Sequence, residues 1–123
     1  MKISIITVTL NSSQTIRDTL NSVFSQNYKN IEHIIVDGGS KDGTYSILKK
    51  YPFKNKKIFI KKNFGIYKSI NYGIKKSTGK YLCILNSDDI FHSNDTIKNI
   101  VKFISKNKKS KIFLGNVAYF DHS

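Results

Sequence analysis

The chain has 123 residues and a mass of 14.1 kDa, of which 39% are hydrophobic and 24% charged, and it carries a formal net charge of +13. This length fits one globular domain with one core, and the composition excludes a disordered tail, a collagen-like repeat and a coiled coil. The apolar runs are too short for a spanning helix or a secretory signal. The single cysteine, Cys83, excludes an internal disulfide and a cysteine zinc cluster. We therefore expect a cytoplasmic location.

The predicted elements alternate between strands and helices, which is typical of an α/β domain with a mainly parallel sheet. A near-continuous apolar run over residues 3–10 predicts a strand that is covered on both faces. Apolar residues at helical spacing predict a helix over residues 16–24, with a polar cap among residues 11–13. A second buried strand over residues 31–36 runs into the turn-rich stretch 37–43.

The second half of the chain continues the alternation. The expected elements are a helix over residues 44–51, a strand over 58–60, a helix over 66–74, a strand over 81–85, a helix over 97–104 and a strand over 112–117. Isoleucines at positions 66, 70 and 74 are expected to form the buried stripe of the third helix. The fourth strand is apolar throughout, so we expect it to be buried, with Cys83 as a small core residue.

Polar residues follow the carboxyl ends of three predicted strands, where open α/β sheets bind ligands. Thr9 and Asn11 follow the first strand, Asp37 ends the second, and Asp88 and Asp89 follow the fourth. Two adjacent carboxylates repel each other unless a cation or hydrogen-bond donors compensate. Carboxylates with few other protein ligands suit Mg²⁺ or Mn²⁺, which also bind water and a substrate diphosphate. The alternative is that the two aspartates form a turn and cap the next helix.

Two glycine motifs that bind nucleotide phosphates are missing from the sequence. Neither G-x-G-x-x-G nor G-x-x-x-x-G-K-[ST] occurs, and the first strand is followed by Asn-Ser-Ser-Gln. Carboxylates and a metal ion must therefore hold any diphosphate.

Four motifs follow one another along the chain. They are IITVTLN at residues 5–11, IIVDGGSKDGT at 34–44, GIY with NYGI within 65–74, and GKY with LNSDD within 79–89. Together they resemble the N-terminal half of a family 2 glycosyltransferase, and the resemblance covers essentially the whole chain. It implies a Rossmann-like, mainly parallel sheet flanked by helices, the GT-A fold, and it favours a functional role for the acidic pair over the turn-and-cap alternative.

The resemblance also implies a nucleotide-diphosphate sugar as donor, with a UDP- or dTDP-sugar expected. In this family Thr9 and Asn11 would line the nucleoside pocket, and Asp37 would accept a hydrogen bond from the base. Gly38 would let the backbone pass close to the donor. Asp88 would contact the ribose or the sugar.

A divalent cation, Mg²⁺ or Mn²⁺, is the cofactor that the resemblance implies. Asp89 would be its main ligand, with Asp88 beside it, and the cation would neutralise the diphosphate as the nucleotide leaves.

Three positions depart from the family pattern. Asn86 replaces a first aspartate, Gly38 replaces a second aspartate after the second strand, and Lys68 stands where an aspartate usually follows Gly-Ile-Tyr. The last change reverses a charge and argues against a contact of that helix with the donor.

The general base of an inverting transfer is the missing part. Such a base, an aspartate or glutamate, takes the proton of the acceptor hydroxyl and normally lies well after the Asp-Asp motif. Only Asp121 is acidic after Asp95, so we assign no catalytic residue. We expect residues 1–123 to be a donor-binding domain, apparently truncated, that lacks most of the acceptor-binding half; a non-catalytic nucleotide-sugar-binding domain is the alternative. The family implies a saccharide or lipid-linked acceptor in bacterial surface polysaccharide or lipopolysaccharide assembly.

The basic charge comes almost entirely from lysine. Lysine accounts for 20 of the 21 basic residues, and it occurs with 19 isoleucines and 12 asparagines. Base and phosphate readout in nucleic acids favours arginine, so this composition argues against a nucleic-acid-binding domain. A lysine surface suits anionic lipid headgroups, and we expect peripheral contact with the inner face of a membrane.

Overall fold

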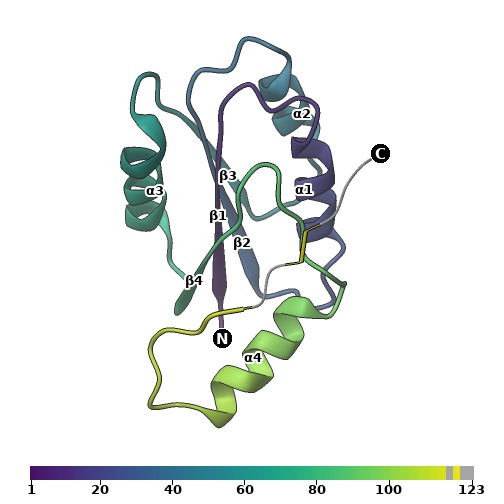
Figure 1. The fold of residues 1–123 in the computed structure, drawn as a ribbon, viewed down its shortest axis with the longest axis vertical. Coiled ribbons are helices and arrows are strands. Elements are labelled where there is room, and N and C mark those ends of the chain that lie inside the picture. The colour runs from purple at the N-terminus through teal and green to yellow at the C-terminus, as the bar shows by residue number, and fades with distance from the viewer. Residues whose placement is uncertain (116–117, 120–123) are drawn as a thin grey trace.

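The computed structural model describes residues 1–115, 118 and 119. They form a parallel sheet with the strand order β3-β2-β1-β4, flanked by helices (Figure 1). The strands are β1 (Ile3–Thr9), β2 (Ile31–Asp37), β3 (Lys56–Ile60) and β4 (Tyr81–Ile84), and the helices are α1 (Ile16–Phe24), α2 (Thr44–Lys50), α3 (Gly65–Lys76) and α4 (Thr96–Lys106). The predicted α/β class and parallel sheet are confirmed.

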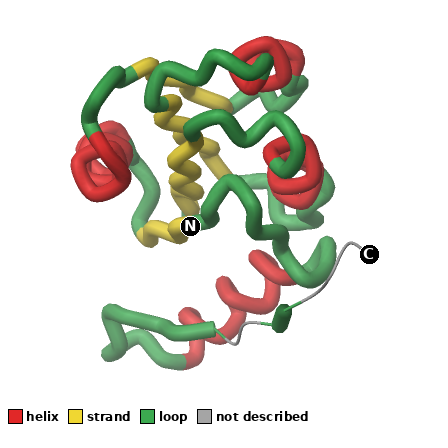
Figure 2. The backbone as a smooth tube through the Cα atoms, turned by 45° about the horizontal axis from the view of Figure 1, so that its top comes forward, coloured by secondary structure: helices red, strands yellow, loops and turns green. Residues whose placement is uncertain are grey.

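The two central strands carry the core. Apolar side chains on one face of β1 and β2 pack under α1 and α2, and those on the other face pack under α3, as the layers in Figures 1 and 2 show. The residues are Ile16, Leu20, Ile35, Leu48 and Tyr51 on the first face and Ile6, Ile34 and Val36 on the second. Because both faces are covered, these strands require the near-continuous apolar runs seen in the sequence.

Helix α1 buries three of its four predicted apolar positions, while Phe24 is 47% exposed. The polar cap expected among residues 11–13 is wrong in detail. Thr15 is the N-cap residue and makes no side-chain cap bond, while the carbonyl of Ser12 accepts the backbone N–H groups of Thr15 and Ile16. The side chains of the loop are used for tertiary contacts instead.

Helix α3 buries a different stripe from the one predicted. Ser69 and Gly73 face the sheet, whereas Ile66 is 53% and Ile74 39% exposed. A Cβ atom at Gly73 would lie 2.7 Å from Cγ2 of Ile6, so the missing side chain allows the helix to pack closely on β1. Packing through small residues turns the isoleucines to the flank.

Strand β4 is an edge strand, which corrects the expectation of a buried one. Leu82 is 44% and Ile84 50% exposed, while Cys83 packs partly against the core on the α1 side. Burial there raises the pKa of the Cys83 thiol to about 11. The predicted fifth strand is wrong for residues 112–115, which are irregular, and its last two residues lie outside the described part of the chain. The described sheet therefore has four strands rather than five.

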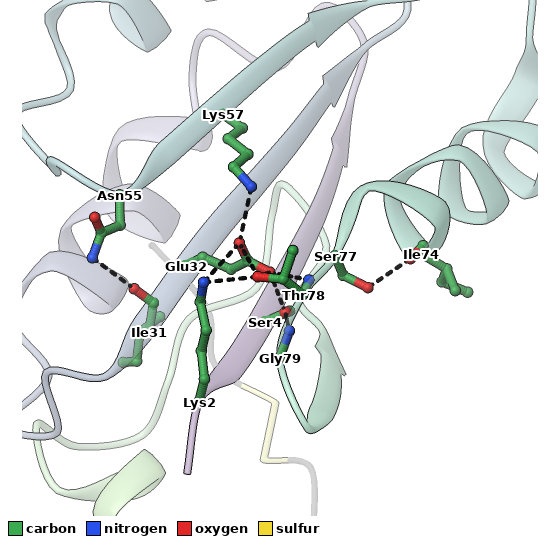
Figure 3. Close-up of polar contacts among 10 residues, drawn as sticks. All are labelled: Lys2, Ser4, Ile31, Glu32, Asn55, Lys57, Ile74, Ser77, Thr78 and Gly79. Atoms are coloured by element: carbon green, nitrogen blue, oxygen red, sulfur yellow. Dashed lines mark hydrogen bonds and ion pairs between the residues drawn. The ribbon is translucent and has the colours of Figure 1, made fainter.

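A buried carboxylate ties the amino ends of the strands together (Figure 3). Glu32, whose side chain is 2% exposed, accepts a hydrogen bond of 2.5 Å from Ser4 and others from the backbone and hydroxyl of Thr78. Its second oxygen lies 3.2 Å from Nζ of Lys57 and 3.5 Å from Nζ of Lys2. Burial would raise the pKa of Glu32, but the hydrogen bonds from Ser4, Thr78 and Lys57 outweigh it and lower the pKa to about 2.

Helix α4 lies near the N-terminus, at the amino ends of the strands (Figure 1). The buried amide of Gln26 holds it there, since Gln26 accepts a hydrogen bond from the backbone of Ile97 and donates one to the carbonyl of Ser93. Within the described residues, the helices are all too short or too polar to cross a membrane.

Candidate functional site

The loop after β1 is joined to the loop after β2. Asn11 adopts a left-handed conformation with φ of 50°. Its backbone N–H donates to the hydroxyl of Ser40 over 2.9 Å, and its side-chain oxygen accepts the N–H of Lys41 over 2.8 Å. Asn11 is exposed, and its side-chain amide nitrogen has no hydrogen bond to the described residues. The sequence therefore places Asn11 at the edge, and the fold uses it to align two loops.

The carboxylate of Asp37 organises the loop after β2. One oxygen accepts the N–H groups of Gly39 and Ser40 over 3.0 and 2.9 Å, and the other accepts the Ser40 hydroxyl over 2.6 Å. Gly39 has φ of 93°, which favours glycine. A carboxylate has about four acceptor positions, so three are filled and about one remains. Asp37 is 1% exposed, which restricts access to that position.

Asp42, which the sequence analysis did not single out, closes the same loop. Its carboxylate accepts the N–H and hydroxyl of Thr44 on one oxygen and the N–H of Ser13 on the other, at 2.6 to 3.1 Å. Hydrogen bonds from Thr44 and Ser13 hold the pKa of Asp42 well below its usual range. Asp followed two residues later by Thr is the spacing of a local side-chain turn, and this signal could have identified it.

The hydroxyl of Thr9 lacks a partner. Thr9 is 1% exposed, and among residues 1–115, 118 and 119 its Oγ1 is the buried side-chain oxygen or nitrogen without a hydrogen bond. Thr9 lies opposite Asp37 in the β1–β2 register, at the carboxyl edge. An unpaired buried hydroxyl costs about 1–3 kcal/mol, so a ligand or water that satisfies it there would be stabilised.

The acidic turn after β4 is held by α1. Thr19 shares its hydroxyl hydrogen between the carbonyls of Ser87 and Asp89, at 3.0 and 2.7 Å. The hydroxyls of Ser12 and Ser87 lie 3.0 Å apart, and the N–H of Asp89 donates to the carbonyl of Asn86 over 3.1 Å. The backbone of residues 86–89 is thereby held, so the points from which the two aspartate side chains extend are fixed.

The side chains of Asp88 and Asp89 fit a divalent cation that brings other ligands with it. Both are exposed, and no hydrogen bond or ion pair to either carboxylate occurs in the described part of the chain. Residues 1–115, 118 and 119 contain no cluster of three or more His, Cys, Asp or Glu side chains able to hold a metal. A hard cation that keeps its waters and binds a diphosphate needs only one or two carboxylates, which matches this donor set. The two aspartates do form a turn, but Asp95 is the N-cap residue of α4, so they do not cap that helix.

The edge brings some predicted residues together and keeps others apart. Thr9 and Asp37 are neighbours, while Asp88 and Asp89 lie on the other side of β1, beyond β4. Ser12 connects the two sides, because its N–H donates to the hydroxyl of Thr44 over 2.9 Å and its hydroxyl meets Ser87. No local pattern in the sequence marks Ser12 as a bridge.

The strand order changes direction beside β1, since the chain adds β2 and β3 on one side and β4 on the other. In open α/β sheets such a switch point, at the carboxyl ends of the strands, is where ligands bind. The polar residues after β1 and β4 lie at this point. The fold is thus that of the open, mainly parallel α/β proteins, with polar residues gathered at the switch point.

Comparison with known proteins identifies the family. Residues 4–123 match the family model described as Glycosyl transferase family 2, and the chain belongs to that family. An uncharacterized glycosyltransferase of Rickettsia bellii is 36% identical over 97% of this chain and 17% of its own length. The PGL/p-HBAD biosynthesis glycosyltransferase of Mycobacterium bovis is 32% identical over 93% of this chain and 46% of its own length. The chain therefore spans less than half the length of these relatives.

Solved structures share the fold. S. aureus TarS 1-349 in complex with UDP-GlcNAc is 31% identical, with a TM-score of 0.81 over 88% of this chain and 32% of the other. The mannosyltransferase PcManGT from Pyrobaculum calidifontis, in complex with GDP-Man and Mn²⁺, is 24% identical, with a TM-score of 0.78 over 85% of this chain and 32% of the other. At that identity the second likeness concerns the fold alone. The fold is GT-A, as predicted.

Proposed function

We propose that this chain binds a nucleotide-diphosphate sugar and a divalent cation at the carboxyl edge of its sheet, as the donor-binding domain of a glycosyltransferase. One observation carries the proposal. Asp88 and Asp89 stand on a turn that Ser12 and Thr19 hold in place, and in the described structure no other side chain occupies their carboxylates. Unpaired carboxylates at a switch point suit a cation that accompanies a nucleotide diphosphate.

The nucleoside would lie beside β1. The unpartnered hydroxyl of Thr9, the free amide nitrogen of Asn11 and the last acceptor position of Asp37 are the groups that would meet it. Gly38 would let the donor approach the backbone, and its missing side chain also leaves room for Leu10, since a Cβ atom there would lie 3.3 Å from Cδ1 of Leu10. The remaining acceptor position of Asp37 would take the ring N–H of uracil or thymine, in line with the proposed UDP- or dTDP-sugar.

The diphosphate end of the donor would lie near the acidic turn. Asp89 would be the main metal ligand, and Asp88 would contact the cation and the ribose or sugar. When bound, Mg²⁺ or Mn²⁺ would neutralise the charge that develops on the leaving nucleotide. This chain would contribute a turn that is already ordered before the ligand binds. The hydrogen bonds from Thr19 hold the backbone of that turn, so binding need not order it.

The acceptor side is proposed to come from elsewhere in a longer polypeptide. In an inverting displacement the acceptor hydroxyl attacks the anomeric carbon while a carboxylate takes its proton. We assign that base to no residue of this chain, and Asp121 lies outside the described residues. A saccharide or lipid-linked acceptor in bacterial surface polysaccharide or lipopolysaccharide assembly, reached from the cytoplasmic face of the membrane, is the proposed context. The matched relatives extend well beyond the length of this chain, which supports this division of labour.

Calorimetric titration with UDP, with and without Mn²⁺, tests the proposal. The wild-type chain should bind UDP more tightly with Mn²⁺, and Asp89→Ala should lose at least about tenfold in affinity, the value of one charge-assisted contact. Asp18→Ala, which removes an exposed carboxylate on α1, is the matched control and should bind normally. Equal binding by Asp89→Ala and wild type would remove the metal assignment, and the absence of UDP binding by wild type would remove the proposed function. Salt-sensitive binding of nucleic acid without a metal requirement would instead support a lysine-rich nucleic-acid-binding domain.

A further inference from the structure

The segment that follows β3 and begins α3 is basic, apolar and exposed. Residues 61–68 read Lys-Lys-Asn-Phe-Gly-Ile-Tyr-Lys, and we call them the basic-aromatic turn. Ile66 is 53% and Tyr67 81% exposed, and Lys62 and Lys68 are exposed beside them. Exposed apolar side chains next to one another lower the cost of contact with an apolar phase, which single scattered ones do less.

The backbone fixes where this turn stands. Asn63 and Gly65 have φ of 63° and 73°, two left-handed residues that turn the chain sharply into α3. The N–H of Lys61 donates to the carbonyl of Asp37 over 2.8 Å, so the turn is anchored to the end of β2. Figure 1 shows the start of α3 at the same end of the molecule as the loop between β1 and α1. The turn and the proposed donor site therefore share one edge.

The positive charge around the turn is concentrated and held in position. Nζ of Lys68 lies 4.3 Å from the ring centre of Phe64, and Nζ of Lys61 lies 4.6 Å from that of Tyr72. Such cation–π contacts restrict the lysines to this surface. Residues 61–68 contain three lysines, Lys61, Lys62 and Lys68, and no aspartate or glutamate. The turn therefore has no carboxylate of its own to neutralise this charge.

We propose that the basic-aromatic turn docks on an anionic phospholipid surface, with Ile66 and Tyr67 at the boundary between headgroups and acyl chains. The lysines then lie among the headgroup phosphates, where compact ammonium charges need no fixed geometry. The apolar pair favours a membrane over a soluble polyanion, because only a membrane offers an apolar phase to enter. The net charge of +13 on each chain argues against a second copy as the partner.

The inference rests on the proposed peripheral location of the glycosyltransferase and names the surface that makes the contact. Docking through this turn would bring the donor-binding edge to the membrane, where a lipid-linked acceptor is found. It needs no spanning helix.

Vesicle co-sedimentation of the 123-residue chain tests the inference. The chain should bind vesicles of equimolar phosphatidylcholine and phosphatidylglycerol, bind phosphatidylcholine alone much more weakly, and dissociate as salt is raised. Lys62→Gln with Lys68→Gln should weaken partitioning about 30-fold, and Ile66→Ser with Tyr67→Ser at least about tenfold.

Two matched double variants serve as controls. Lys108→Gln with Lys109→Gln removes the same charge from exposed positions after α4, and Leu114→Ser with Tyr119→Ser removes an aliphatic and a tyrosine side chain that are 95% and 96% exposed. Both controls should change partitioning less than about threefold.

The inference would be overturned if the wild-type chain did not bind anionic vesicles, or if the control variants lost as much binding as the test variants. It would also be overturned if Ile66→Ser with Tyr67→Ser bound vesicles normally while soluble heparin competed. That result would indicate a soluble polyanion as the partner. Titration of the same apolar variant with UDP and Mn²⁺ separates this inference from the proposed function. Normal UDP binding with lost vesicle binding supports the docking surface, and failure of wild type to bind UDP would count against the function alone.

Discussion

Thr9 and Asp37 are partners in the β1–β2 register and are equally buried, at 1% exposure, but only the polar atoms of Asp37 are hydrogen-bonded within the described residues. The Asp37 carboxylate receives three hydrogen bonds from its own loop, whereas the Thr9 hydroxyl has no hydrogen bond to any described residue. Asp37 therefore builds the loop, whereas the hydrogen-bonding capacity of the Thr9 hydroxyl is unused by the described residues.

Thr9→Val should not lower the free energy of unfolding and should raise it by up to about 1–3 kcal/mol, because no hydrogen bond within the described residues is lost and a buried hydroxyl without a partner is removed. Thr7→Val is the matched control two residues earlier on the same strand and face. It should destabilise the fold by about 1–3 kcal/mol, because the Thr7 hydroxyl pairs with buried His33 over 2.8 Å. Urea unfolding measures both, and UDP titration of Thr9→Val should show an affinity loss of about tenfold if the hydroxyl meets the nucleoside. Strong destabilisation by Thr9→Val would mean that the hydroxyl has a structural partner.

Glu32 should make the fold sensitive to strong acid. Its pKa is about 2 in the folded chain and 4.5 in the reference state, so the carboxylate stabilises the fold above about pH 4.5 and this contribution is lost as pH falls toward 2. Glu32→Gln should lower the free energy of unfolding by about 2–3 kcal/mol at neutral pH, because the ion pairs with Lys2 and Lys57 are lost. The free energy of unfolding of this variant should also depend less on pH between 4.5 and 2. Thermal unfolding against pH measures this, and an unchanged slope would exclude Glu32 as the cause.

His33 should make the stability of the fold depend on pH in a less acidic range than Glu32 does. Complete burial lowers the pKa of His33 to about 3 from 6.5, and its ring nitrogens meet the hydroxyls of Thr7 and Tyr51. Below about pH 6.5 the imidazole of His33 is protonated in the unfolded chain but not in the folded chain. The free energy of unfolding therefore decreases as pH falls from 6.5 toward 3. His33→Gln cannot take up this proton. Its stability should depend less on pH between 6.5 and 4.5, where Glu32 is still ionised in both states, and an unaltered slope there would contradict the assignment.

Gly73→Ala should destabilise the fold by about 1–3 kcal/mol, although alanine favours helices over glycine by about 1 kcal/mol. The added Cβ would lie 2.7 Å from Ile6, and α3 would have to move away from β1. Gly115→Ala, where a Cβ would meet no heavy atom within 4 Å, is the control and should be neutral. Urea denaturation compares the two, and a neutral Gly73→Ala would mean that α3 packs more loosely than described.

Helix and strand order could be predicted because the signals are local. The apolar runs of β1 and β2 and the helical spacing of α1 are properties of neighbouring residues, and the family resemblance added the GT-A fold. The roles of the site residues remain predictions, since they depend on ligands that are absent here.

The errors occurred where periodicity cannot tell which face is covered. The isoleucines of α3 have the spacing of a buried stripe, but Gly73 allows the closest approach to β1, and that approach set the rotation of the helix. Strand β4 has the composition of a central strand, yet it lies at the edge of the described sheet.

The sequence by itself determined that a parallel α/β domain presents polar residues after three of its strands, because strand direction places successive carboxyl ends at one edge. Only the tertiary structure decided what each residue does there. Contacts such as that between Ser12 and Ser87, 75 residues apart, turn some of these side chains into supports. The hydroxyl of Thr9 and the carboxylates of Asp88 and Asp89 have no hydrogen-bond partner among the described residues. The physical reason is that a side chain has few donor and acceptor positions, and the groups that the fold brings within reach fill them first.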